Sequence, residues 1–213
     1  MDDQVRERIL DALHDRFSGD STGHGLDHSL RVTTNALAIC REEGGDPDIV
    51  ELAALLHDAD DRKLFGDDYR DCRFASGLMR DCGFPDVTIA KVRDIIQHLS
   101  FKGSDTEVPD SIEGRIVQDA DRLDAIGAIG IARAFAYGGR KGRAMYDPEQ
   151  PPTLGMDETQ YFDNKGTTIN HFYEKLFLLK DMMNTDTGRR IAGDRHAFME
   201  EFVRRFKEEW NGL

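Results

Sequence analysis

The stretch IVELAALLHDAD, residues 49–60, decides the fold that this sequence predicts. Its apolar residues recur at three- and four-residue intervals and crowd into a dense stripe, which is typical of a buried helix. His57 and Asp58 stand where the apolar run ends. Two side chains that can bind metal therefore close the most apolar helix of the chain, although a His-Asp pair in this place is also common as a C-terminal cap and turn.

Helical spacing continues outward from this stretch along nearly the whole chain. The segment that begins at Leu26 and reaches Cys40 keeps the three- and four-residue interval. Breaks rich in Gly, Pro and Asp separate further candidate helices, and no alternating strand pattern competes with them. These helices are expected at residues 3–17, 70–81, 86–99, 112–124, 126–137, 165–183 and 187–210. The sequence predicts an all-α fold and a single domain over residues 1–213.

One long irregular segment interrupts the helices at residues 138–163. It contains Gly138-Gly139, Pro148, Pro151-Pro152 and Gly155. A connection of this length is unusual in a compact domain and is often functional. We expect a long loop here that acts as a lid.

Composition narrows the class of protein. A chain of 213 residues can bury a core without disulfides or structural metals, so a bound metal is expected to be functional. The three cysteines are odd in number and form no CxxC pair, which favours reduced thiols. The charged start MDDQVRERIL and the lack of a long apolar run predict a cytoplasmic protein that does not enter membranes. The net charge of −13 argues against nucleic-acid polymers as partners.

Two more metal-binding side chains complete a set with His57 and Asp58. His28 lies in the first turn of its helix, and Asp121 falls beside the apolar face of another. Each has an ordinary structural alternative, because His28 could be a hydrogen-bonded structural residue and Asp121 could pair with a neighbouring arginine. Asp119 or Asp124 could also take the inward position. Imidazole nitrogens combined with carboxylate oxygens suit manganese, iron, cobalt, nickel or zinc better than calcium or magnesium.

The ordered set resembles the HD superfamily of metal-dependent phosphohydrolases, whose signature is His, then His-Asp, then Asp on successive helices. The strings that carry the resemblance are GHGLDHSLRV (23–32), AALLHDAD (53–60) and QDADRLDAIGAIGIARAF (118–135). Stand-alone bacterial and archaeal HD hydrolases, some of them nucleoside triphosphate pyrophosphohydrolases, are similar in the C-terminal strings YGGRKGR (137–143), YDP (146–148), HFYEKLFLLKDMMNT (171–185) and RHAFMEEFVRRF (195–206). The resemblance implies a motif core at about 24–125, with the helices of 165–210 closing the cleft.

This resemblance implies a mononuclear metal centre. His28, His57, Asp58 and Asp121 would bind one divalent ion, with manganese favoured and nickel, cobalt, iron or zinc as alternatives. Binuclear relatives place two further histidines between the His-Asp pair and the last Asp, whereas this chain has His98 alone in that interval. His98 is then expected to contact a substrate phosphate or the attacking water, or to be a surface residue.

Water handling and substrate binding involve other residues. Asp61 stands where related HD nucleotidases carry an acid that orients or deprotonates water, although it could be a solvated charge. Arg31 could meet an anionic substrate or form a plain ion pair. The basic string around residues 140–143, on flexible backbone, could hold a polyphosphate or could be a solvated loop. Two residues of the closing helix, at 173 and 175, could face the same cleft or lie beside the packing face of that helix. These candidates are Arg140, Lys141, Arg143, Tyr173 and Lys175.

The resulting hypothesis is a divalent-metal-dependent phosphohydrolase with catalytic Asp58, Asp61 and His98. Its expected substrates are (deoxy)nucleoside triphosphates, cleaved to monophosphate and pyrophosphate. A 5'-nucleotidase or other phosphomonoesterase is an alternative, and so is a nucleotide sensor that binds without turnover. Small residues at Gly127, Ala128, Gly130 and Ala132 permit close helix packing within a subunit or in a homodimer.

Overall fold

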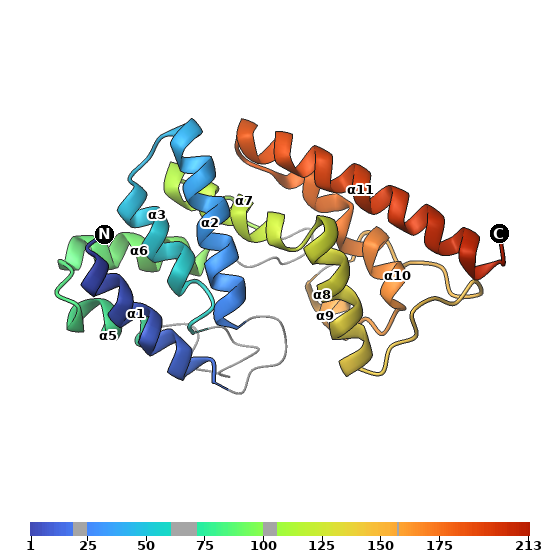
Figure 1. Ribbon diagram of the computed structural model, residues 1–213, viewed down its shortest axis with the longest axis horizontal. Helices are drawn as coiled ribbons and strands as arrows, with labels where there is room; N and C mark the ends of the chain where they lie inside the picture. The colour runs from blue at the N-terminus through green and yellow to red at the C-terminus, as the bar shows by residue number, and fades with distance from the viewer. Residues whose placement is uncertain (19–24, 61–71, 100–105, 157) are drawn as a thin grey trace. The chain divides into compact units, whose positions relative to one another are not determined.

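The computed structural model of the protein describes residues 1–18, 25–60, 72–99, 106–156 and 158–213 (Figure 1). Every regular element within these ranges is helical, so the predicted all-α fold is confirmed. None of the described helices is long and apolar enough to cross a membrane. The α-helices are α1 (Asp3–Arg16), α2 (Leu26–Glu43), α3 (Pro47–Leu56), α5 (Arg73–Asp81), α6 (Asp86–Gln97), α7 (Ile112–Asp124), α8 (Gly127–Arg140), α9 (Glu158–Asp163), α10 (Thr168–His171) and α11 (Asp186–Trp210).

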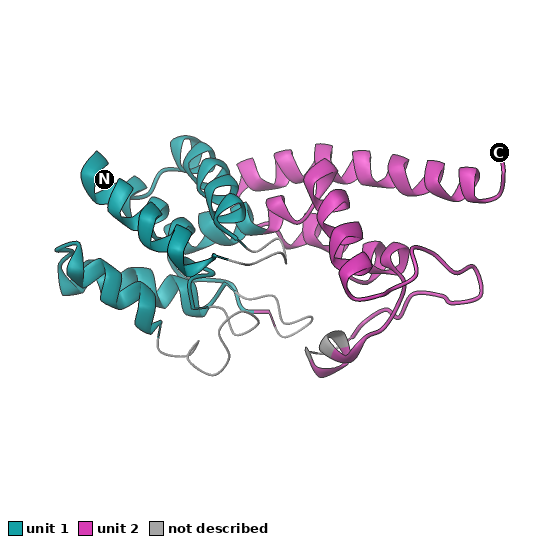
Figure 2. Ribbon diagram, turned by 60° about the horizontal axis from the view of Figure 1, so that its bottom comes forward, with its two compact units in different colours: residues 1–100, 107–121 teal, residues 101–106, 122–213 magenta. Residues whose placement is uncertain are grey.

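The chain forms two compact units, coloured separately in Figure 2. The first contains residues 1–100 and 107–121, and the second contains residues 101–106 and 122–213. Helix α7 contributes residues to both, with Asp121 in the first unit and Arg122 in the second. The single domain expected over 1–213 stays a prediction.

Helix α3 forms the centre of the first unit. Asp46 caps its start by accepting a hydrogen bond from the backbone N–H of Asp48, and Pro47 occupies its first turn, where a missing N–H costs nothing. The helix packs against α2 and α6, and Leu52, Leu55 and Leu56 are fully buried. This apolar packing fixes the end of α3, which is where His57 and Asp58 follow.

The core of the second unit is aromatic. Helix α8 packs against α11 and α10, and Phe135 of α8 lies near Phe172, Phe202 and Phe206. Rings at these separations make offset and edge-on contacts that add to the free energy of burial. The cluster joins α8 to the C-terminal helix within this unit.

The predicted loop at 138–163 holds over residues 141–156 and differs at both ends. Helix α8 continues through Gly138 and Gly139 to Arg140, so Arg140 lies on a helical turn and not on flexible backbone. Gly138 packs closely against α10, where a Cβ would lie 2.3 Å from Oγ1 of Thr168. At the other end, α9 occupies residues 158–163.

The single helix predicted at 165–183 is wrong in detail. Helix α10 is followed by a π-helical turn at Phe172–Leu176 and a 3₁₀ turn at Leu178–Met182. Glu174 is buried in the π turn, and its carboxylate accepts from the backbone N–H of Thr153 and from Nδ2 of Asn164. Thr153 and Asn164 therefore bind a carboxylate on the π turn that a regular amphipathic helix would leave in water.

Candidate metal centre

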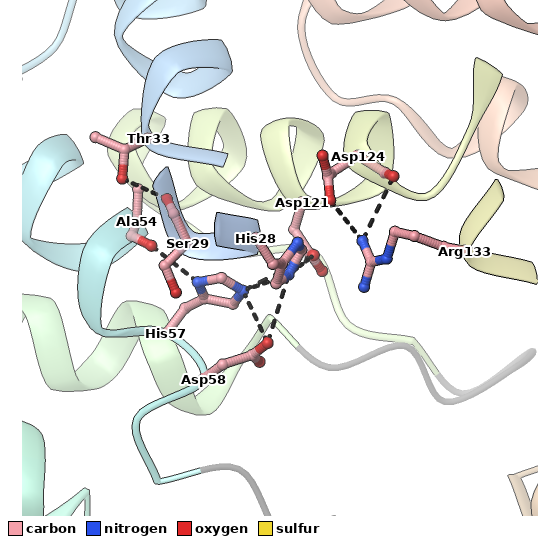
Figure 3. Close-up of polar contacts among 9 residues, drawn as sticks. All are labelled: His28, Ser29, Thr33, Ala54, His57, Asp58, Asp121, Asp124 and Arg133. Atoms are coloured by element: carbon pink, nitrogen blue, oxygen red, sulfur yellow. Dashed lines mark hydrogen bonds and ion pairs between the residues drawn. The ribbon is translucent and has the colours of Figure 1, made fainter. Parts of the chain in front are cut away.

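Four side chains from three helical regions converge in the first unit (Figure 3). His28 is in the first turn of α2, His57 and Asp58 follow α3, and Asp121 is in the last turn of α7. Nε2 of His28 lies 3.2 Å from Nε2 of His57, 3.4 Å from Oδ2 of Asp58 and 3.3 Å from Oδ1 of Asp121. Nε2 of His57 lies 3.5 and 3.8 Å from the same two carboxylate oxygens.

The ring of His57 is oriented by its own helix. Its Nδ1 lies 2.9 Å from the carbonyl oxygen of Ala54, which can only accept a hydrogen bond. Nδ1 therefore carries the proton, and Nε2 presents its lone pair to the other three side chains when the ring is neutral. Backbone carbonyls commonly orient metal-binding histidines in this way.

The structure selects Asp121 from the three carboxylates of α7 that the sequence left open. Asp121 is partly exposed and points toward the two imidazoles (Figure 3). Asp119 is fully buried, and Asp124 is held by Nη1 of Arg133 at 2.5 Å. Helical spacing alone allowed each of them to face inward, and ion pairing within the second unit removes Asp124 from consideration.

The chemistry of this cluster fits a divalent cation. The ligand atoms of His28, His57 and Asp58 all lie within 4.8 Å of one another, and these three residues are buried. Asp121 adds a second carboxylate oxygen close to both imidazoles. Buried carboxylates and imidazole lone pairs that face one another repel unless a positive charge lies among them. A mixed nitrogen and oxygen set suits a borderline divalent metal.

His98 contacts residues other than these four. Its Nδ1 lies 2.7 Å from the carbonyl oxygen of Asp94, and its Nε2 lies 3.8 Å from Oε2 of Glu107. The side chain is 39% exposed. Its backbone is fixed by Gln118 of α7, whose Nε2 donates to the carbonyl oxygens of His98 and Glu107 at 3.2 and 2.9 Å.

Arg31 and Asp61 are two further residues with predicted roles. Arg31 lies on α2, three residues after His28, and is partly buried. Asp61 lies outside the described residues. The proposed roles of both stay predictions.

The basic candidates at the end of α8 belong to the second unit. Arg140 is exposed in the last helical turn. Lys141 and Arg143 both lie over the ring of Tyr137, with cation-to-centroid distances of 5.7 and 5.6 Å. Arg143 also donates from Nη2 to the carbonyl oxygen of Asn164 at 2.8 Å, so its guanidinium is held in place.

Tyr173 and Lys175 lie on the π turn. The hydroxyl of Tyr173 accepts a hydrogen bond from Nζ of Lys207 at 3.0 Å, and the same ammonium lies 4.8 Å from the centroid of the tyrosine ring. Tyr173 thus joins the π turn to α11. Burial, together with the positive charges of Lys175 and Arg143, lowers the pKa of nearby His171 to about 3.

One residue next to the cluster escaped the sequence-based predictions. Asp60 is 4% exposed, and its carboxylate accepts from the backbone N–H groups of Phe74 and Ala75. Sequence gives a weak signal for such a bond, because Asp60 stands in the acidic string DADD, where a solvated charge is the ordinary interpretation. The partners are also about 14 residues away along the chain.

Comparison with known proteins identifies the family. The HD domain family matches residues 25–126, which contain all four converging side chains. YpgQ of Bacillus subtilis is 39% identical over 99% of this chain and 94% of its own length. This chain belongs to the HD family. The predicted resemblance is confirmed.

Solved structures share the fold along nearly the whole chain. A protein from Lactobacillus plantarum is 39% identical, with a TM-score of 0.86 over 100% of this chain and 99% of its own. An HD-superfamily hydrolase from Bacillus thuringiensis is 39% identical, with a TM-score of 0.77 over 99% and 98%. The structure of YpgQ of B. subtilis in complex with ADP has 37% sequence identity to this chain, with a TM-score of 0.75 over 97% of this chain and 96% of its own.

Proposed function

We propose that this HD protein is a divalent-metal-dependent phosphohydrolase that cleaves (deoxy)nucleoside triphosphates to monophosphate and pyrophosphate. The convergence of His28, His57, Asp58 and Asp121 carries the proposal, because this donor set suits a borderline divalent cation. The complex of its relative YpgQ with ADP supports a nucleotide as the ligand. Manganese is the metal we favour.

The four converging residues would hold one metal ion. A divalent ion, when bound, polarises a phosphoryl oxygen and lowers the pKa of a water molecule. The buried His28 and His57 supply neutral nitrogen donors, and the hydrogen bond from His57 to Ala54 keeps one ring oriented before any ion arrives. A single metal is favoured because His98 is the one further histidine between Asp58 and Asp121, where binuclear relatives have two.

Hydrolysis requires that a water oxygen form a bond to the α-phosphorus while the bond to the bridging oxygen of pyrophosphate breaks. We assign orientation of that water to Asp58 and removal of its proton to Asp61, with His98 as a relay. A carboxylate is a suitable acceptor, since it takes the proton without forming a covalent intermediate. The proposal therefore needs no nucleophilic side chain.

Substrate binding requires cations in a chain whose net charge is −13. We propose that Arg31 meets the phosphates near the metal and that Arg140, Lys141, Arg143 and Lys175 contribute further positive charge. The guanidinium of Arg143 is held in place by Tyr137 and Asn164. A restrained arginine loses less entropy when it binds phosphate. Tyr173 is engaged with Lys207, and its predicted contact with substrate would require that this hydrogen bond be shared or broken.

A nucleotide panel tests the proposal. The protein is incubated with nucleoside and deoxynucleoside mono-, di- and triphosphates, with and without manganese, and pyrophosphate and inorganic phosphate are measured separately. We expect manganese-dependent release of pyrophosphate from triphosphates. Release of inorganic phosphate alone would indicate a phosphomonoesterase, and nucleotide binding without turnover under any metal would indicate a sensor.

A further inference from the structure

Asp60 links the turn that carries His57 and Asp58 to the start of α5. Its carboxylate accepts two hydrogen bonds of 3.0 Å, from the backbone N–H groups of Phe74 and Ala75. These are the second and third residues of α5. Asp60 is only 4% exposed, and its bond to Ala75 is buried.

Helix α5 needs this carboxylate because it has no cap of its own. Cys72 precedes the helix with φ 44° and ψ 46°, in the left-handed region, and makes no side-chain cap hydrogen bond. The first N–H groups of a helix have no partner within the helix and carry the positive end of its dipole. An acidic side chain from a distant segment supplies both the acceptor and the complementary charge, which compensates for burying Asp60.

The same turn is held from a second direction. Nε of Arg16, the last residue of α1, donates to the carbonyl oxygen of Ala59 at 3.1 Å. The Arg16 guanidinium also lies 4.8 Å from the ring centroid of Phe74, the residue whose N–H binds Asp60. Both α1 and α5 thus bind the turn. Phe74 of α5 contacts Arg16 of α1 as well as Asp60 of the turn.

We infer that Asp60 is a positioning residue of the metal centre, because it fixes the backbone that places His57 and Asp58. The inference rests on the proposed metal site. Asp58 and Asp60 are two residues apart, and two residues span at most about 7 Å of extended chain. Because the chain between them is so short, release of Asp60 from α5 also moves Asp58. Metal ligands have to be held to within about 0.5 Å of their working geometry.

Asp2 offers a matched control for a simple helix cap. It stands before α1 and accepts hydrogen bonds from the N–H groups of Gln4 and Val5 at 3.0 and 3.3 Å. The chemistry is that of Asp60 at α5, but Asp2 is far along the chain from every proposed ligand. Asp60→Ala, Asp60→Asn and Asp2→Ala are compared with the wild-type protein.

The measured quantities are the affinity for Mn²⁺ and Co²⁺ without nucleotide and the visible spectrum of the cobalt-loaded protein. Asp60→Ala is expected to weaken metal affinity by roughly 10- to 100-fold and to change the cobalt spectrum. Asp60→Asn keeps one acceptor oxygen and is expected to have a smaller effect, and it carries the test if the alanine variant does not fold. Asp2→Ala should lower the melting temperature and leave the affinity and the spectrum unchanged.

Wild-type affinity and spectrum in folded Asp60 variants would overturn the inference and leave Asp60 as a helix cap alone. Failure of the wild-type protein to bind either ion would overturn the proposed metal centre as well. Absence of nucleotide turnover would bear on the proposed reaction only, because no nucleotide is present in these measurements.

Discussion

Two carboxylates of α7, three residues apart, should respond in opposite ways to the same substitution. Asp121 lies near the imidazoles of the proposed metal centre and is 35% exposed. Asp124 is 2% exposed and paired with Arg133, whose side chain is 21% exposed. Replacing each by alanine therefore separates metal binding from stability along one helix.

The magnitudes follow from these environments. Asp121 is 35% exposed and faces another carboxylate and two imidazoles, so the free energy of unfolding without metal should change by less than about 1 kcal/mol in Asp121→Ala. Loss of a direct ligand should weaken metal affinity by at least roughly 100-fold, which corresponds to about 2.7 kcal/mol. Asp124→Ala removes the buried carboxylate that Arg133 binds, and breaking a pair of this kind costs about 3 kcal/mol. For a chain of this size the melting temperature should fall by roughly 6–12 °C.

The assay combines two measurements on the same proteins. Metal content is determined by elemental analysis after dialysis against manganese, and stability is determined by denaturant unfolding of the metal-free protein. Asp110→Ala, which removes an exposed carboxylate just before α7, is the control and should change neither quantity. Full metal content in Asp121→Ala, or equal loss of metal in Asp121→Ala and Asp124→Ala, would refute the assignment of Asp121.

Three further predictions concern the second unit. Arg140→Ala should weaken binding of a nucleoside triphosphate about tenfold more than binding of the monophosphate, as measured by calorimetry, and equal losses would exclude contact with distal phosphates. The pKa of His171, lowered from 6.5 to about 3, predicts an imidazole that stays neutral by NMR down to about pH 4. In the unfolded chain this imidazole takes up its proton near pH 6.5, before it does in the folded protein. The free energy of unfolding should therefore fall as pH drops from 6.5 toward 3, and His171→Gln should reduce this dependence. Gly138→Ala should cost about 1–3 kcal/mol of unfolding free energy by clashing with Thr168, and the double variant with Thr168→Ala should recover part of it, whereas additive losses would contradict the close contact.

The helices could be predicted because they depend on local spacing, whereas the resemblance to the HD superfamily joined the four side chains into one set. The apolar interval in residues 49–60 places His57 and Asp58 at the end of a buried helix, and the interval around Asp121 places it beside an apolar face. Local spacing could not choose between Asp121 and Asp124. That choice depends on Arg133, whose ion pair with Asp124 forms only in the folded chain.

Features that depend on long-range contacts could not be predicted from local sequence patterns. The close approach of Gly138 in α8 to Thr168 in α10, where a Cβ would lie 2.3 Å from Oγ1, joins segments 30 residues apart. The π turn accompanies the burial of Glu174 against the loop. The hydrogen bond between Asp60 and α5 compensates for a helix start at Cys72 that lacks a side-chain cap. The sequence around Asp60 does not indicate α5 as its partner, and the sequence of α5 does not indicate Asp60.

Anomalous diffraction at the manganese absorption edge, from crystals grown with Mn²⁺, tests the central claim most directly. We predict one anomalous peak per chain, within coordination distance of Nε2 of His28, Nε2 of His57 and the carboxylates of Asp58 and Asp121. A peak held by other residues, or no peak among these four side chains, would contradict the assignment of this cluster as the metal centre.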